Sequence, residues 1–131
     1  MKKLLFTASG RINRATFWKG FLLVIGVTLV AGAAVFGYAS AMAPAGTGDE
    51  PIQLEGAAAV PMVIGMFAII AFNIVAGLCL AIKRLHDRNK SGWWMLIQFI
   101  PLIGSIWYFI EVGFLAGTKG ENRFGADPLA L

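Results

Sequence analysis

Charged residues in this chain are gathered into short blocks, and the stretches between the blocks are long and apolar. Three such stretches cover residues 20–43, 61–82 and 93–115, and the first two contain no Asp, Glu, Lys or Arg. At about 1.5 Å per residue, each is long enough as a helix to cross a hydrocarbon core of roughly 30 Å. The pattern predicts an all-α integral membrane protein built as a three-helix transmembrane bundle.

The composition agrees with a bilayer environment, since 58% of the residues are hydrophobic and 14% are charged. Soluble domains carry roughly 45–50% apolar and about 25% charged residues. The polar tail, residues 117–131, and the connecting loops are too short to form a second core, so we expect a single membrane domain over residues 1–131. The first stretch could also be a secretory signal, but it is longer than the roughly 7–15 apolar residues of such signals, and a retained span is predicted.

Basic residues near membrane spans stay on the cytoplasmic side, so their distribution predicts the orientation. Those before the first stretch are Lys2, Lys3, Arg11, Arg14 and Lys19. Those after the second stretch are Lys83, Arg84, Arg88 and Lys90. Between the first two stretches the charged residues are Asp49, Glu50 and Glu55. We therefore expect a multi-pass protein with a cytoplasmic N-terminus, a cytoplasmic loop at 83–90 and an outward-facing loop at 44–56.

The third stretch contains Pro101 and Gly104 near its centre, a pair that can kink a helix or reverse it. A kinked span would deliver the tail to the outside, whereas a re-entrant hairpin would return it to the cytoplasm. We predict the kinked span, because apolar stretches of about 18 or more residues usually cross the membrane.

The segment GRINRATFW precedes the first stretch and encodes a helix start, with Asn13 as the cap of a helix that begins at Arg14. A short interfacial helix is expected at the N-terminus. Trp18 would lie at headgroup depth, and Arg11 and Arg14 would reach phosphates, so the bilayer and its anionic headgroups are the expected partners. The net charge is +4, but the basic residues flank apolar segments, so no nucleic-acid partner is expected.

The only histidine, His86, stands beside Asp87 and near Arg84 in RLHDRNKSGWW. The group could transfer protons or bind an anion, or it could be a tight connector. No nucleophile accompanies the pair, and the single Cys79 lies within an apolar stretch. We expect no catalytic, metal or cofactor site.

The second stretch has a candidate helix-packing face with four-residue spacing. It consists of the polar Asn73 and the small residues Gly77 and Ala81, and the matching stripe in the first stretch is Ala33, Gly37 and Ala41. Such faces allow helices to pack closely, and the amide could add an interhelical hydrogen bond of about 0.6–2 kcal/mol. A pore lining is the alternative, and its polar residues would be Asn73, Gln98 and Glu111.

Three blocks in order, GRINRATFW, RLHDRNKSGWW and GTKGENRFGADP, give the chain its resemblance to a bacterial membrane family called domain of unknown function 805. In the first block the matching positions are Gly10, Arg11, Arg14, Phe17 and Trp18, with Thr16 replacing an expected acidic residue. In the second they are Arg84, Leu85, His86, Asp87, Ser91, Gly92 and Trp93. In the third they are Gly117, Gly120, Asn122, Arg123, Phe124, Gly125, Asp127 and Pro128. The resemblance implies the bacterial inner membrane and no established activity; a cytoplasmic tail would bring Asn122, Arg123 and Asp127 to the first two blocks.

We therefore expect a small non-catalytic membrane protein that acts through helix association or through lipid or partner binding. The partner could be a second copy of the chain or another membrane protein. A subunit of a small transporter or channel is the alternative, and a membrane-embedded enzyme using His86 and Asp87 is the least favoured reading.

Overall fold

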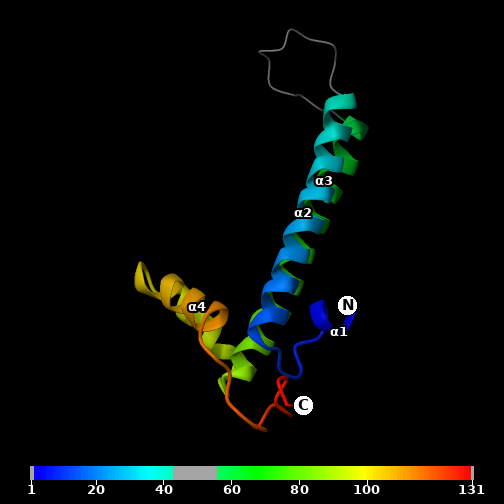
Figure 1. The fold of residues 1–131 in the computed structure, drawn as a ribbon. Helices are drawn as coiled ribbons and strands as arrows, with labels where there is room; N and C mark the ends of the chain where they lie inside the picture. The colour runs from blue at the N-terminus through cyan, green and yellow to red at the C-terminus, as the bar shows by residue number, and fades with distance from the viewer. Residues whose placement is uncertain (1, 43–55, 131) are drawn as a thin grey trace. The chain divides into compact units, whose positions relative to one another are not determined.

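The computed structural model describes residues 2–42 and 56–130, and these residues form helices joined by loops (Figure 1). The elements are α1 (Lys2–Leu5), α2 (Arg14–Met42), the 3-10 helix η1 (Gly56–Ala58), α3 (Ala59–Asp87), the 3-10 helix η2 (Gly92–Phe99) and α4 (Ile103–Gly113). Within the described residues there is no strand, so the all-α prediction is confirmed. The predicted outward loop at 44–56 lies almost entirely outside them.

The two long helices, α2 and α3, are the only described elements long enough and apolar enough to cross a membrane. Each has 29 residues, which corresponds to about 43 Å of helix. As predicted, α2 begins at Arg14, where the Thr16 N–H donates to Asn13 Oδ1 at 2.8 Å. Helix α3 continues five residues beyond the predicted 61–82 span, so a rigid helix carries Arg84 to Asp87.

The chain divides into two compact units, residues 24–74 and the remainder, which are described separately. In the 24–74 unit, Asn73 Nδ2 donates to Thr28 Oγ1 at 2.9 Å and Thr28 Oγ1 donates to Asn73 Oδ1 at 3.1 Å. The Gly65 backbone lies close to the Val35 side chain, since a Cβ added at Gly65 would be 2.8 Å from Val35 Cγ2. At Gly37 of the predicted stripe, no neighbouring atom would contact an added Cβ, so that packing face remains a prediction.

The third apolar stretch is a helical hairpin, not the predicted kinked helix, and a third membrane span is therefore not confirmed. Its arms, η2 and α4, pack against each other. At the turn, the Ile103 N–H donates to the Pro101 carbonyl at 2.8 Å, and Leu102 between them has a φ of 65°. The chain reverses because this left-handed residue follows a proline that cannot continue the helix. Gly104 lets the arms touch, since a Cβ there would overlap the Ile97 carbonyl oxygen.

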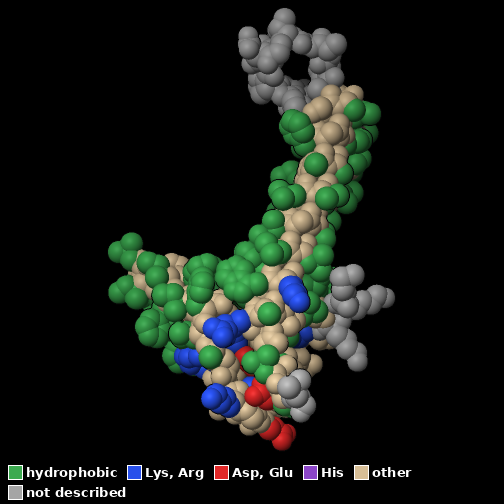
Figure 2. Space-filling view, in the orientation of Figure 1, with side chains coloured by type: hydrophobic (Ala, Val, Ile, Leu, Met, Phe, Trp, Pro, Cys, Tyr) green, Lys and Arg blue, Asp and Glu red, His purple; other side chains and the backbone are tan. Residues whose placement is uncertain are grey.

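The unit formed by residues 1–23 and 75–131 holds a small apolar core and a buried set of charges. Its buried charged residues are Lys83, Arg84, Asp87 and Glu111. Figure 2 shows charged side chains gathered beside the tail, while hydrophobic side chains cover the helices. This charged region is where the blocks singled out in the sequence meet.

Candidate functional site

The C-terminal tail binds the end of α3 through backbone and side-chain hydrogen bonds. The Thr118 N–H and Oγ1 both donate to the Asp87 carbonyl, at 2.8 and 3.0 Å. Asn122 Nδ2 donates to the His86 carbonyl at 2.9 Å and to Thr118 Oγ1 at 2.8 Å. The third sequence block therefore lies against the second, as the hairpin topology required.

The carboxylate of Asp87 lies between two arginines and is the centre of this region. Arg11 Nε donates to Asp87 Oδ1 at 3.2 Å, and Arg84 Nη1 donates to Asp87 Oδ2. The side chains of Arg84, Arg11 and Asp87 are 0%, 1% and 4% exposed. Arg84 also donates to the carbonyls of Val112, at the end of α4, and Leu115, just after it. This Arg–Asp–Arg group is buried and hydrogen-bonded throughout.

Arg11 uses its remaining donors to hold the tail. Its Nη1 donates to the carbonyls of Gly120 at 2.7 Å and Gly125 at 3.1 Å, and its Nη2 donates to the Thr118 carbonyl at 2.6 Å. One guanidinium thus ties the first block to the second and third. The prediction that Arg11 reaches lipid phosphates is wrong for this structure, because its side chain is buried and its donors are occupied.

The other two interfacial residues of the first block contact the end of α4. Arg14 is exposed and donates to the Phe114 carbonyl at 3.0 Å. Trp18 Nε1 donates to the Gly113 carbonyl at 3.0 Å, and its ring packs edge-on against Phe109 and Phe114. The start of α2 therefore holds the base of the hairpin.

Glu111 forms a second buried ionic group. Its Oε1 accepts from Arg88 Nε at 2.5 Å and from Lys90 Nζ at 2.7 Å, while its own side chain is 2% exposed. Arg88 Nη1 also donates to the Ala116 carbonyl at 2.6 Å. These contacts join α4 to the turn after α3 and occupy a carboxylate that was a candidate for a pore lining.

His86 and Asp87 are adjacent in sequence but have different partners. The His86 ring stacks on Phe124 with centroids 3.8 Å apart, and its Nδ1 lies 3.2 Å from the Gly10 carbonyl oxygen. The Arg123 guanidinium lies over the Phe124 ring at 4.7 Å. Since the Asp87 carboxylate is held by arginines, the two side chains do not form an acid–base pair.

Asp127 closes the tail on itself. Its carboxylate accepts from the backbone N–H groups of Leu129 and Gly120, both at 2.9 Å. These two donors hold the pKa of the carboxyl below its ordinary value, because they favour the charged form. Among residues 2–42 and 56–130, no three His, Cys, Asp or Glu side chains are placed to share a metal ion.

We name the assembly of these contacts the polar latch; its members are Arg11, Arg84, His86, Asp87, Arg88, Lys90, Glu111, Thr118, Asn122, Arg123 and Asp127. The sequence analysis singled out most of them but missed the role of Glu111 and Arg88. The signal for that pair was a single carboxylate in an otherwise uncharged apolar stretch, which needs a cationic partner when buried.

Comparison with known proteins shows similarity over nearly the whole chain. The chain is 34% identical over 121 residues to "Inner membrane protein YhaI" of Escherichia coli, covering 92% of this chain and 84% of that protein. It is 32% identical over 120 residues to "Inner membrane protein YhaH" of the same organism, covering 91% and 84%. "Uncharacterized protein YiiR" of Escherichia coli is 26% identical over 151 aligned positions, covering 97% and 89%. No solved structure matches.

The match to a family model also includes the first two sequence blocks and the third block as far as Ala126, because it runs from residue 5 to residue 126. It confirms the resemblance drawn from those blocks. The latch residues from Arg11 to Arg123 lie inside the matched range. Proteins named as inner membrane proteins of Escherichia coli are thus relatives of this chain, and the chain itself belongs to the family described as "Protein of unknown function (DUF805)".

Proposed function

We propose that this protein is a non-catalytic protein of the bacterial inner membrane that acts by associating with other chains in the bilayer. The observation that carries the proposal is the use of the charged groups in the polar latch. Arg11 and Arg84 both bind Asp87, and Arg88 and Lys90 both bind Glu111. The arginines' other donors bind backbone carbonyls. Groups held in this way stabilise a structure and offer no free nucleophile or base.

The proposal includes an orientation with both termini in the cytoplasm. The tail is hydrogen-bonded to the carbonyls of His86 and Asp87, and the basic residues of the 83–90 segment favour the cytoplasmic side. A tail on that side also keeps Lys119 and Arg123 in the cytoplasm, in agreement with the positive-inside rule. Two spans, α2 and α3, then cross the membrane.

The surface for association is the small-residue face of α2. Ala33 and Gly37 are exposed, and an added Cβ at Gly37 would meet no neighbouring atom. A helix from a second copy or from another membrane protein could approach this face closely.

A cysteine crosslinking experiment in native membranes tests association. In a Cys79→Ala background, we expect Ala33→Cys to form crosslinks to a second copy or to another membrane protein. Ala39→Cys is the matched control, because Ala39 is 6% exposed within the chain. Absence of any adduct at Ala33→Cys, or equal adducts at both positions, would contradict association through this face.

Labelling of intact cells with a membrane-impermeant thiol reagent tests the orientation. We expect Lys119→Cys, at an exposed position of the tail, to be protected until the cells are lysed. Thr47→Cys, which lies outside the described residues in the predicted outward loop, should be labelled at once. Labelling of Lys119→Cys in intact cells would place the tail outside and overturn the two-span proposal.

The alternative functions have less support. The Asn73 amide is bonded to Thr28 and to the Ile69 carbonyl, and Glu111 is neutralised by two cations, so neither offers a free group for a transport path. The separate partners of His86 and Asp87 likewise favour a structural role over a catalytic one.

A further inference from the structure

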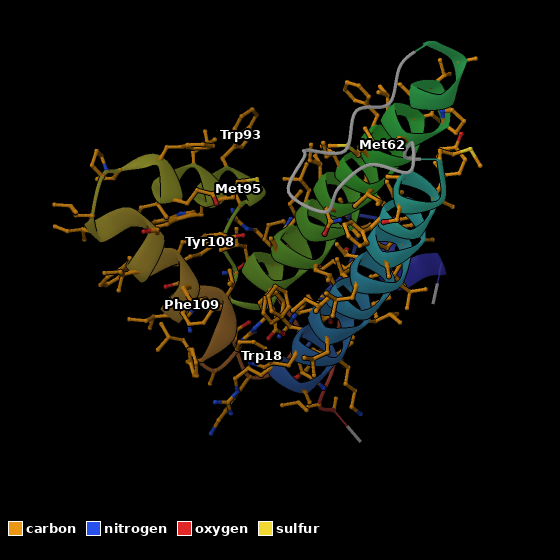
Figure 3. All side chains as sticks on the ribbon, turned by 90° about the horizontal axis from the view of Figure 1, so that it is seen from above. Trp18, Met62, Trp93, Met95, Tyr108 and Phe109 are labelled. Carbon is orange, nitrogen blue, oxygen red and sulfur yellow. The ribbon has the colours of Figure 1, made fainter. Side chains whose placement is uncertain are left out.

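The hairpin formed by η2 and α4 exposes large apolar side chains from base to tip. At the tip, Leu102 is 86% exposed and Ile103 is 71% exposed, and at the start of η2 Trp93 is 76% exposed. The chain contains no charged residue between Lys90 and Glu111. Figure 3 shows the apolar side chains of both arms, including Trp93 and Phe109, on a hairpin that extends away from the end of α3. A tip of this kind is stable only where acyl chains or another apolar surface cover it.

The lengths of the two arms restrict how far the hairpin can reach. The eight residues of η2 span about 16 Å at roughly 2.0 Å per residue, and the 11 residues of α4 span about 16 Å at roughly 1.5 Å per residue. Half of a hydrocarbon core of about 30 Å is about 15 Å. Even if it stood upright in the membrane, the hairpin would fill one leaflet and stop near the midplane.

The base of the hairpin carries the groups that belong at the membrane surface. The Lys90 ammonium lies 4.0 Å from the centre of a Trp94 ring and also binds Glu111. Trp18 holds the other arm through the Gly113 carbonyl. Tryptophan side chains are enriched at headgroup depth and basic residues flank membrane spans, so the base of the hairpin carries the residue types expected at the membrane surface.

From this geometry we propose that the η2–α4 hairpin is a wedge inserted into the acyl chains of a single leaflet, the one on the side of the polar latch. Two spanning helices add equal area to both leaflets, whereas the wedge adds the area of two more helices to one leaflet only. The protein therefore favours membranes that are convex on the latch side. The assignment of that leaflet as the cytoplasmic one rests on the proposed orientation.

The depth of the tip is measured with full-length protein carrying Cys79→Ala and Leu102→Cys, labelled with an environment-sensitive fluorophore. The protein is reconstituted in vesicles of phosphatidylethanolamine and phosphatidylglycerol that contain lipids with a quencher high or low on the acyl chain. We expect a blue-shifted emission with strong quenching by the deep quencher. Water-like emission overturns the wedge. Weak quenching that strengthens when the protein is diluted in lipid also overturns it, because it would show that a second copy, and not lipid, covers the tip before dilution.

The preference for curvature is tested by comparing the orientation of the protein in small sonicated vesicles, which are strongly curved, with its orientation in large extruded vesicles. The fraction of Lys119→Cys, at an exposed position of the tail, that reacts with an impermeant reagent reports how many molecules have the latch outside. We expect most molecules to have the latch outside in small vesicles, and no such excess in large ones. Ile106→Lys, at an exposed position of α4, should abolish the excess, and the matched Ile106→Leu should retain it; trypsin resistance of the tail shows that each variant is folded.

The two proposals fail in different ways. Lys119→Cys labelled in intact cells contradicts the orientation but leaves the depth of the tip as expected here. A water-exposed tip, or equal orientation in vesicles of both sizes, contradicts the wedge whichever side the tail occupies.

Discussion

Replacement of Asp87 by Asn removes one negative charge from between two buried guanidinium groups. The side chain keeps its size, and its backbone carbonyl can still accept from Thr118. What is lost is the charge that both Arg11 and Arg84 face, at side-chain exposures of 4% or less for all three groups. The substitution therefore isolates the electrostatic contribution of the latch from its packing.

The size of the effect follows from this burial. Removal of one partner from a buried ion pair costs about 3–5 kcal/mol, because the remaining charge stays out of water without compensation. Each tenfold change in an equilibrium corresponds to about 1.4 kcal/mol, so the open form of the tail should become roughly a hundred to several thousand times more populated.

Trypsin cleavage of the detergent-solubilised protein measures this opening. The tail contains Lys119 and Arg123, and cleavage at Lys119 requires release of the Thr118 contacts with Asp87. When closing is faster than cleavage, the rate follows the population of the open form. We expect much faster loss of the tail in Asp87→Asn than in the unmodified protein.

Glu121→Gln is the matched control, since it makes the same chemical change at an exposed position of the tail. Surface changes of this kind usually alter stability by no more than about 0.5 kcal/mol. If Asp87→Asn and Glu121→Gln were cleaved at the same rate, the buried triad would not hold the tail and the latch would need another explanation.

Three further predictions concern other contacts. Gly104→Ala should lower the stability of the hairpin by about 1–3 kcal/mol, because its Cβ would overlap a carbonyl of η2, whereas Gly26→Ala, in open space, should not; equal unfolding midpoints would argue against close arm packing. A double-mutant cycle of Asn73→Leu and Thr28→Val should give a coupling of about 0.6–1.7 kcal/mol in unfolding measurements, and zero coupling would show that their hydrogen bonds are not formed in the membrane. The pKa of Asp127 is lowered in the folded protein, so its contribution to the stability of the tail is present above the ordinary aspartate range and is lost as pH falls through the folded pKa. Pepsin digestion of the tail should accelerate as this contribution is lost, and Asp127→Asn should lack this pH dependence.

The sequence was sufficient for the features that depend on local chemistry. Asn13 caps α2 at the predicted residue because its side chain meets an N–H only three residues away. The long apolar stretches became α2 and α3, and the order of the three blocks was sufficient to identify the family. Each of these signals is contained within one segment of the chain.

The hairpin could not be predicted because its decisive contacts are long-range. Pro101 and Gly104 are compatible with either a kink or a reversal. The reversal is stabilised by the approach of Gly104 to the Ile97 carbonyl, and by the tail contacts with Asp87, 31 positions before Thr118. A length criterion for apolar stretches contains no information about either contact.

The role of Arg11 was missed for a chemical reason. A guanidinium donates to phosphate and to carbonyl oxygens with the same groups, so an arginine near a membrane surface fits both environments. The tail is rich in glycine and polar residues, and it has little apolar surface with which to fold by itself. A single planar group with several donors can bind carbonyls of Thr118, Gly120 and Gly125 together, whereas a lysine ammonium would act as one point charge. The tail is therefore ordered by side chains from the other two blocks, and the three blocks form one structural unit although more than 70 residues separate Arg11 from Asp87.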